Sequence, residues 1–239
     1  MNEFYLIIFT HVCLIVYYTN CQYFFLLITF QGIAIIMPDT SPRHDETVPD
    51  INSYDLGVGA GFYVNASQSP YAKHYKMYDY ITQELPSILQ NDFNIGKDGQ
   101  KSVCGHSMGG HGALTIALRE GKSSWKSVSA FSPICNPVDC PWGKRAFETY
   151  LGSVDKGKVH DATCLMEALD SPIYDDILID QGTSDNFLEE QLKPQALETA
   201  AEKVGQKVTL HMRKGFDHSY YFIAKFIEDH VNFHAKYLV

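Results

Sequence analysis

The stretch KSVCGHSMGGHGALTIALRE (residues 101–120) determines the fold expected for this chain of 239 residues. Its first part, 101–104, is a short apolar run of the kind that forms a buried strand, and 108–120 has the composition of a helix. Between them, GHSMG (105–109) matches G-x-S-x-G, a pattern that sets a serine on a sharp strand-to-helix turn. We therefore expect the Ser107 hydroxyl to project beyond the end of a strand.

Short apolar or β-branched runs alternate with stretches of helical periodicity after residue 31, which predicts βαβ units around a mostly parallel sheet. The expected strands are 33–37, 101–104, 127–131, 176–180 and 207–212. The expected helices are 72–91, 108–120, 143–151, 187–204 and 219–237. Together with the serine turn, this order predicts an α/β-hydrolase fold with helices on both faces of the sheet.

The composition is typical of one globular domain and argues against several kinds of partner. Hydrophobic residues make up 45% of the chain and charged residues 20%, and no linker divides it. The net charge of −9, with scattered Lys and Arg, argues against nucleic-acid binding. The six cysteines lack the spacing of a zinc site, so we expect free thiols in a reducing compartment and no metal.

A serine hydroxyl becomes a good nucleophile only when a base takes its proton, so the chain must supply a histidine and a carboxylate that orients it. In this fold the acid and then the histidine follow the serine along the chain. Asp185 and His218 each follow a predicted strand across a short turn, at the sheet edge from which Ser107 emerges. We predict these three as catalytic residues, and the Met108 N–H as a donor to the oxyanion.

Other residues compete for the two supporting roles. Asp180 stands close to the end of its strand, and Asp217 is adjacent to His218 and cannot easily turn back to its ring. His106 and His111 lie beside the serine in the sequence. We expect them to pack around the turn, because the base must approach the serine from a different loop.

From about residue 31 to residue 238 the chain resembles the S-formylglutathione hydrolases, a family also called esterase D. The resemblance is carried by MPDTSPR (37–43), GAGFYV (59–64), GHSMGGHGAL (105–114), SPICNPVDCPWGKRAF (132–147), HDATCL (160–165), DILIDQG (176–182) and FDHSYYFIAKFIEDHVNFHAKYL (216–238). On this resemblance Ser107, Asp185 and His218 match the family's nucleophile, acid and base.

The resemblance implies a cytoplasmic thioesterase without a cofactor that hydrolyses S-formylglutathione to glutathione and formate, a step of formaldehyde detoxification. Ser107 would attack the formyl carbon, and water would then release formate with His218 as general base. Trp142 would be a wall of the small acyl pocket, or else an aromatic residue of the core. A general small-acyl carboxylesterase and a catalytically silent remnant are the alternatives, and a homodimer stays open.

Residues 1–30 form an atypical hydrophobic segment before the expected hydrolase domain, 31–239. The stretch 4–30 has no charged side chain. A membrane span, a secretory signal and buried strands are all open for it, with a membrane the less expected environment. Members of the family carry several strands here, and a loop resembling LSGLTC that supplies a second oxyanion donor, which residues 1–30 do not match.

The fold that the resemblance implies has one more strand, between the predicted strands 33–37 and 101–104. We hypothesise that part of residues 4–18 or 23–30 fills this place, because both stretches are rich in strand-forming residues. A second hypothesis is that the amino-terminal segment comes from a truncated or mis-spliced gene model, so that the family's amino-terminal part is missing or replaced.

Overall fold

The chain folds around one six-stranded parallel sheet in the computed structural model, which describes residues 5–10, 32–43 and 53–238. The strands are β1 (Tyr5–Thr10), β2 (Ile33–Ile36), β3 (Lys101–His106), β4 (Val128–Phe131), β5 (Ile177–Gly182) and β6 (Val208–Arg213). Their order across the sheet is β2-β1-β3-β4-β5-β6, and each neighbouring pair is parallel. The predicted α/β class is confirmed, and each of the predicted strands overlaps an observed one.

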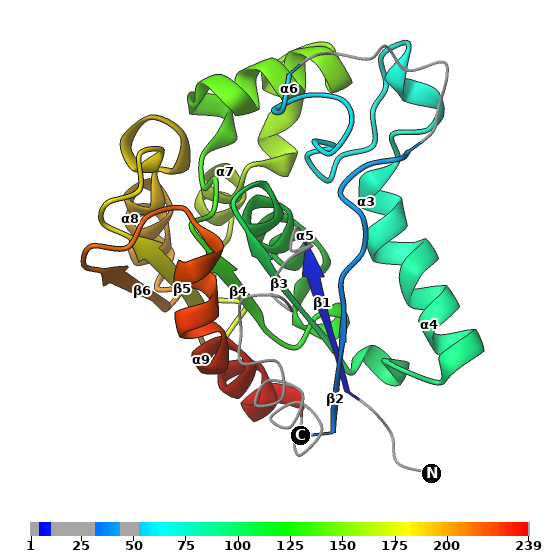
Figure 1. The fold of residues 1–239 in the computed structure, drawn as a ribbon, viewed down its shortest axis with the longest axis vertical. Coiled ribbons are helices and arrows are strands. Elements are labelled where there is room, and N and C mark those ends of the chain that lie inside the picture. The colour runs from blue at the N-terminus through cyan, green and yellow to red at the C-terminus, as the bar shows by residue number, and fades with distance from the viewer. Residues whose placement is uncertain (1–4, 11–31, 44–52, 239) are drawn as a thin grey trace.

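β1 lies between β2 and β3, in the place that the predicted strands left empty (Figure 1). Its residue Ile8 pairs with Ile36 on one side and Val103 on the other, and it is 0% exposed. The hypothesis that part of residues 4–18 fills this place is therefore confirmed. The alternative stretch, 23–30, lies outside the described residues.

Helices cover both faces of the sheet. They are α3 (Met77–Asp79), α4 (Leu85–Phe93), α5 (Met108–Ser124), α6 (Pro141–Leu151), α7 (Ala162–Glu167), α8 (Pro194–Val204) and α9 (Tyr220–Leu238). α9 covers one face, and α5 and α8 cover the other (Figure 1). Successive strand residues point to opposite faces, so Val103 packs in the core with α5 and α8, whereas Cys104 packs in the core with α9. Among the described residues, no helix combines the length and the apolar character that a membrane crossing needs.

Two predicted helices are interrupted. The helix expected over 72–91 is a 3₁₀ turn, Tyr71–Lys73, followed by α3, a π-helical turn, Tyr80–Glu84, and α4. The π-helical turn leads directly to Pro86 in the first turn of α4, a residue without the N–H that a continuous α-helix needs. The helix expected over 187–204 is likewise divided, by a left-handed residue before α8 begins.

Several short helices were not predicted from the sequence. α7 is capped by Asp161, whose carboxylate accepts the Cys164 N–H at 2.9 Å. Three further 3₁₀ helices are Lys97–Gly99, Pro137–Asp139 and Asp155–His160. Elements of one or two turns carry too little periodicity for a sequence pattern to detect.

Candidate active site

Ser107 occupies the tight turn between β3 and α5. Its φ of 56° lies in the left-handed region, which is strained for a residue with a Cβ atom. The turn is held from two sides, because the Ser107 N–H donates to Phe131 O at 2.9 Å and the His111 N–H donates to Ser107 O at 3.0 Å. β4 and α5 thus fix the strained backbone, and Ser107 lines a cavity of about 350 Å³.

Asp185 and His218, predicted from different loops, are hydrogen-bonded to each other. His218 Nδ1 lies 2.6 Å from Asp185 Oδ2. Asp185 is 6% exposed and also accepts the Phe187 N–H at 2.9 Å. Burial acts to raise the pKa of Asp185, but the hydrogen bond and charge of His218, with the Phe187 N–H, hold this pKa below its ordinary value. The ionised carboxylate therefore fixes the imidazole and leaves Nε2 for another partner.

The two loops that carry this pair lie against each other at the end of β5. The Ser184 N–H donates to Phe216 O at 2.9 Å. Gly182 makes this approach possible, because a Cβ atom there would lie 2.3 Å from Phe216 O. The glycine therefore helps to set the separation between Asp185 and His218.

Ser107 and His218 line the same cavity. The segments 54–62 and 134–142 also contribute walls to it. No direct hydrogen bond joins the Ser107 hydroxyl to His218 within the described part of the chain. Such bonds are often long or poorly aligned before substrate binds.

Met108 and Trp142 also line the cavity. Met108 begins α5, where the backbone amides have no partner inside the helix and the helix dipole is positive. Trp142 lies between Tyr54 and Phe187, with ring centroids 5.6 Å and 4.7 Å away. Phe187 is in turn 5.1 Å from the His218 ring, so an aromatic wall runs from Tyr54, which is exposed, to the histidine.

The competing carboxylates do not face this cavity. Asp180 instead accepts hydrogen bonds from Arg213 at 3.0 Å and from His211 at 2.9 Å. Asp217 accepts the N–H of Ser219, two residues ahead of it, at 3.0 Å.

The neighbouring histidines pack around the turn as expected, and one has a role that the sequence did not predict. His111 is fully buried, and its Nε2–H donates to Phe62 O at 3.0 Å. Burial lowers the pKa of His111 to about 4, which keeps the ring neutral. The bond supports Phe62 and Tyr63, two left-handed residues (φ 49° and 50°), of which Phe62 lines the cavity. His106 lies beside His218, with ring centroids 4.5 Å apart.

Residues 1–30 do not match the loop that supplies the second oxyanion donor in the family, and residues 11–31 lie outside the described part of the chain. Thr10, at the carboxyl end of β1, pairs with Gly105 of the serine turn. Within the described ranges, no three His, Cys, Asp or Glu side chains come together as metal ligands. Cys104, Cys135, Cys140 and Cys164 form no disulfide with one another.

Esterases of the α/β-hydrolase class share this sheet and serine turn, and comparison with known proteins agrees. The family model described as "Putative esterase" matches residues 17–233. An S-formylglutathione hydrolase of Arabidopsis thaliana is 50% identical over 209 residues, which make up 87% of this chain and 72% of that relative. The chain belongs to the S-formylglutathione hydrolase family.

Solved structures give the same result. An S-formylglutathione hydrolase from Agrobacterium tumefaciens has a TM-score of 0.89 at 36% identity, over 100% of this chain and 86% of that one. FphF, a fluorophosphonate-binding serine hydrolase of Staphylococcus aureus, has a TM-score of 0.70 at 20% identity, over 98% of this chain and 85% of that one. The second likeness shows the fold alone.

Proposed function

We propose that this chain is a cytoplasmic serine thioesterase that hydrolyses S-formylglutathione to glutathione and formate. The observation that carries the proposal is the 2.6 Å His218–Asp185 pair, whose histidine lines the same cavity as Ser107. The substrate follows from the 50% identity to the Arabidopsis thaliana S-formylglutathione hydrolase.

The reaction uses these residues in two steps. His218 Nε2 takes the proton of the Ser107 hydroxyl as Oγ attacks the formyl carbon, and Asp185 stabilises the imidazolium that forms. The tetrahedral intermediate expels the glutathione thiolate, which receives the proton from His218. Water then attacks the formyl-enzyme with His218 as general base, and formate leaves as Ser107 regains its proton.

Met108 supplies the oxyanion donor in this mechanism. Its N–H stands at the start of α5, beside the serine, so the donor is in place before the reaction begins. Donors that are already oriented need no reorganisation in the transition state, and one such donor contributes about 10²–10³ in rate.

Charged groups beside the cavity suit the leaving group, since glutathione carries two carboxylates and an ammonium group. Asp55 lines the cavity, and its carboxylate accepts a hydrogen bond from Arg145 Nη1 at 2.9 Å. The Arg145 side chain is 48% exposed and lies one turn of α6 after Trp142, so it can bind a further carboxylate. We assign Arg145 to a glutathione carboxylate.

The proposal is tested by thioester hydrolysis with the purified chain, the Ser107→Ala variant, and Ser123→Ala as a control at an exposed serine far along α5. We expect Ser107→Ala to abolish both hydrolysis and covalent labelling by a fluorophosphonate, and Ser123→Ala to change neither. Hydrolysis that survives in Ser107→Ala would refute the assigned nucleophile. A folded wild-type chain that neither turns over nor is labelled would identify a catalytically silent remnant instead.

A general small-acyl carboxylesterase is the second candidate, and the apolar walls of the cavity, which include Phe62, Trp142 and Phe187, favour it. The ratio of kcat/KM for S-formylglutathione to kcat/KM for a simple aryl acetate separates the two. A charge-assisted hydrogen bond to the glutathione part of the substrate contributes about 1.5–3 kcal/mol. We therefore expect the ratio to be about ten or more if the chain recognises glutathione. A ratio below one would favour the general esterase.

A further inference from the structure

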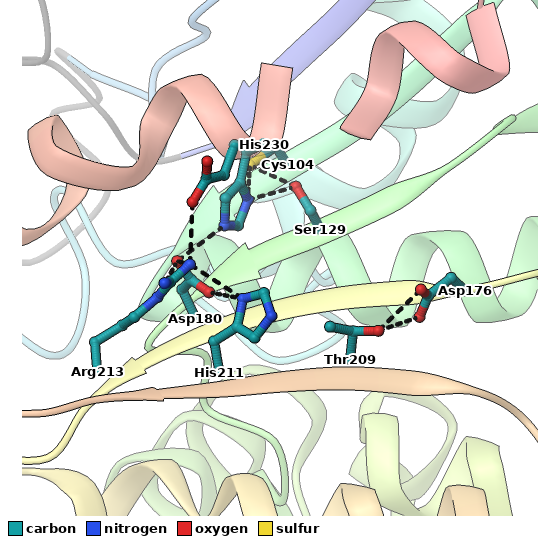
Figure 2. Close-up of polar contacts among 9 residues, drawn as sticks. Cys104, Ser129, Asp176, Asp180, Thr209, His211, Arg213 and His230 are labelled. Atoms are coloured by element: carbon teal, nitrogen blue, oxygen red, sulfur yellow. Dashed lines mark hydrogen bonds and ion pairs between the residues drawn. The ribbon is translucent and has the colours of Figure 1, made fainter. Parts of the chain in front are cut away.

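A second buried carboxylate, Asp180, lies on β5 shortly before Asp185, in the core beneath α9. Its side chain is 0% exposed and its two oxygens meet groups from two other elements (Figure 2). Oδ2 accepts from Arg213 Nε at 3.0 Å, and Oδ1 lies 2.9 Å from His211 Nδ1, both on β6. His230 Nε2, on α9, is 3.8 Å from Oδ2.

The elements that Asp180 joins are those from which the acid and the base extend. Asp180 precedes Asp185 by the same number of residues as Arg213 precedes His218, and the two strands pair in register up to Gly182 and Arg213. An ion pair between Asp180 and Arg213 therefore links β5 and β6 just before the loops that carry the acid and the base begin.

Asp180, His211, Arg213 and His230 form a polar cluster. α9, which begins directly after the His218 loop, takes part in this cluster through two of its own residues. Arg213 donates to Asp229 of α9 at 3.1 Å, and His230 Nδ1 lies 2.8 Å from Ser129 Oγ on β4 (Figure 2). The His230 ring also stacks on Phe131, with centroids 3.7 Å apart. The carbonyl of Phe131 is the acceptor for the Ser107 N–H, so the cluster extends to the support of the nucleophile.

The surroundings of Asp180 favour its ionised form. Burial acts to raise the pKa of Asp180, but the nearby His230 ring and the hydrogen bond and charge of Arg213 hold this pKa below its ordinary value. Asp180 is therefore ionised at neutral pH and keeps the always-charged guanidinium of Arg213 in place.

We propose that Asp180 and Arg213 are positioning residues whose ion pair fixes the carboxyl ends of β5 and β6, and so sets the geometry between Asp185, His218 and Ser107. This goes beyond the proposed function, because it applies to any acyl substrate that reacts at Ser107. Neither residue contacts the cavity, so neither acts on substrate directly.

The same strand pair supplies a matched control. Asp176 precedes β5 and accepts from Thr209 Oγ1 of β6 at 2.9 Å (Figure 2). It also accepts from Lys207 Nζ at 2.6 Å. Its side chain is 14% exposed. It joins the same two strands at their amino ends, away from the loops of the site. Loss of this carboxylate weakens the same sheet without releasing the acid or the base.

The test compares Asp180→Asn with Asp176→Asn. The readouts are kcat, KM and the pH profile for an aryl acetate, the rate of fluorophosphonate labelling, and thermal unfolding. We expect Asp180→Asn to lower kcat and the labelling rate about tenfold or more, with KM within about threefold of wild type, since a shift of about 1 Å at a catalytic group costs up to about 10² in rate. The midpoint of the acid limb should move to lower pH, because a loosened Asp185 stabilises the imidazolium less. Asp176→Asn should lose stability but keep kcat and the pH profile.

If Asp180→Asn does not fold, Arg213→Lys answers the same question, because it keeps the charge and loses the planar fork. We expect Arg213→Lys to have a lower kcat than Asp176→Asn and an acid limb that is shifted to lower pH. Folded variants at positions 180 or 213 with the kcat and pH profile of Asp176→Asn would overturn the proposal. An equal fall in kcat for the variants at 176 and 180 would do the same, since it would indicate a structural role alone.

Discussion

Gly182→Ala tests how closely the loop of the acid and the loop of the base must approach. A Cβ atom at this position would lie 2.3 Å from Phe216 O, 2.8 Å from Phe216 C and 3.0 Å from Asp217 O. Non-bonded heavy atoms rest about 3.5 Å apart, so the chain at residues 216 and 217 must retreat by about 1 Å. These are backbone atoms, which cannot move aside by changing a rotamer.

His218 follows this segment directly and must move with it. A displacement of about 1 Å at a catalytic group costs about 10² in rate, so we expect Gly182→Ala to lower kcat about 100-fold. Overpacking also lowers the free energy of unfolding by about 1–3 kcal/mol. Initial rates of S-formylglutathione hydrolysis, measured beside thermal unfolding by circular dichroism, give both quantities.

Gly121→Ala is the control for this experiment. Gly121 has φ 74°, and a Cβ atom there would meet open space, so alanine adds backbone strain without a collision near the site. We expect it to lower the unfolding temperature and to leave kcat within about twofold of wild type. A folded Gly182→Ala variant with kcat within about threefold of wild type would refute the argument that the contact with Phe216 sets the position of His218.

Three further predictions concern the residues around the serine. Asp185→Asn should lower kcat about 10⁴-fold with little change in KM, because the imidazole loses its orienting carboxylate; steady-state kinetics measure this. Arg145→Ala should raise KM for S-formylglutathione about tenfold and leave KM for an aryl acetate unchanged. The pKa of His111 is about 4 in the folded chain and near 6.5 when unfolded, so the unfolded chain binds the proton first as pH falls. The free energy of unfolding should therefore fall by about 2–3 kcal/mol between pH 7 and pH 4 through this residue, and His111→Gln should flatten that dependence in urea titrations.

Each of these has a clear contrary result. A kcat for Asp185→Asn within tenfold of wild type would mean that His218 is oriented by another group. A KM that rises equally for both substrates of Arg145→Ala would show that the arginine supports the loop at Asp55 and does not bind glutathione. An unchanged pH dependence in His111→Gln would assign the acid sensitivity to other groups.

The serine turn and its partners could be predicted from the sequence because their requirements are local. G-x-S-x-G is a statement about one turn, and the positions of Asp185 and His218 follow from the ends of two strands. β1 could be proposed from its composition and from the empty place in the sheet. The exact residues of β1 could not be predicted, because most segments of residues 4–30 have the same apolar composition as a short buried strand.

The parts that could not be predicted depend on contacts between residues far apart in the chain. No local pattern indicates that the His111 ring supports the carbonyl of Phe62. The sequence presents Asp180 only as a competing candidate for the role of Asp185. Successive residues of a strand point to opposite faces, and only the packed sheet shows which face is buried in the core. Gly182 matters for the same reason, since Phe216 approaches it from the next strand's loop.

The position of β1 inside the sheet has a consequence for synthesis of the protein. β1 pairs with β2 on one side, but on the other side Leu6 pairs with Lys101, so β1 leaves the ribosome about 95 residues before β3. At about 5–20 residues per second, the backbone groups on that side of β1 wait roughly 5–20 s for their partners. During that interval the growing chain is most exposed to misassociation, and we expect it to depend on chaperones then more than at any later stage.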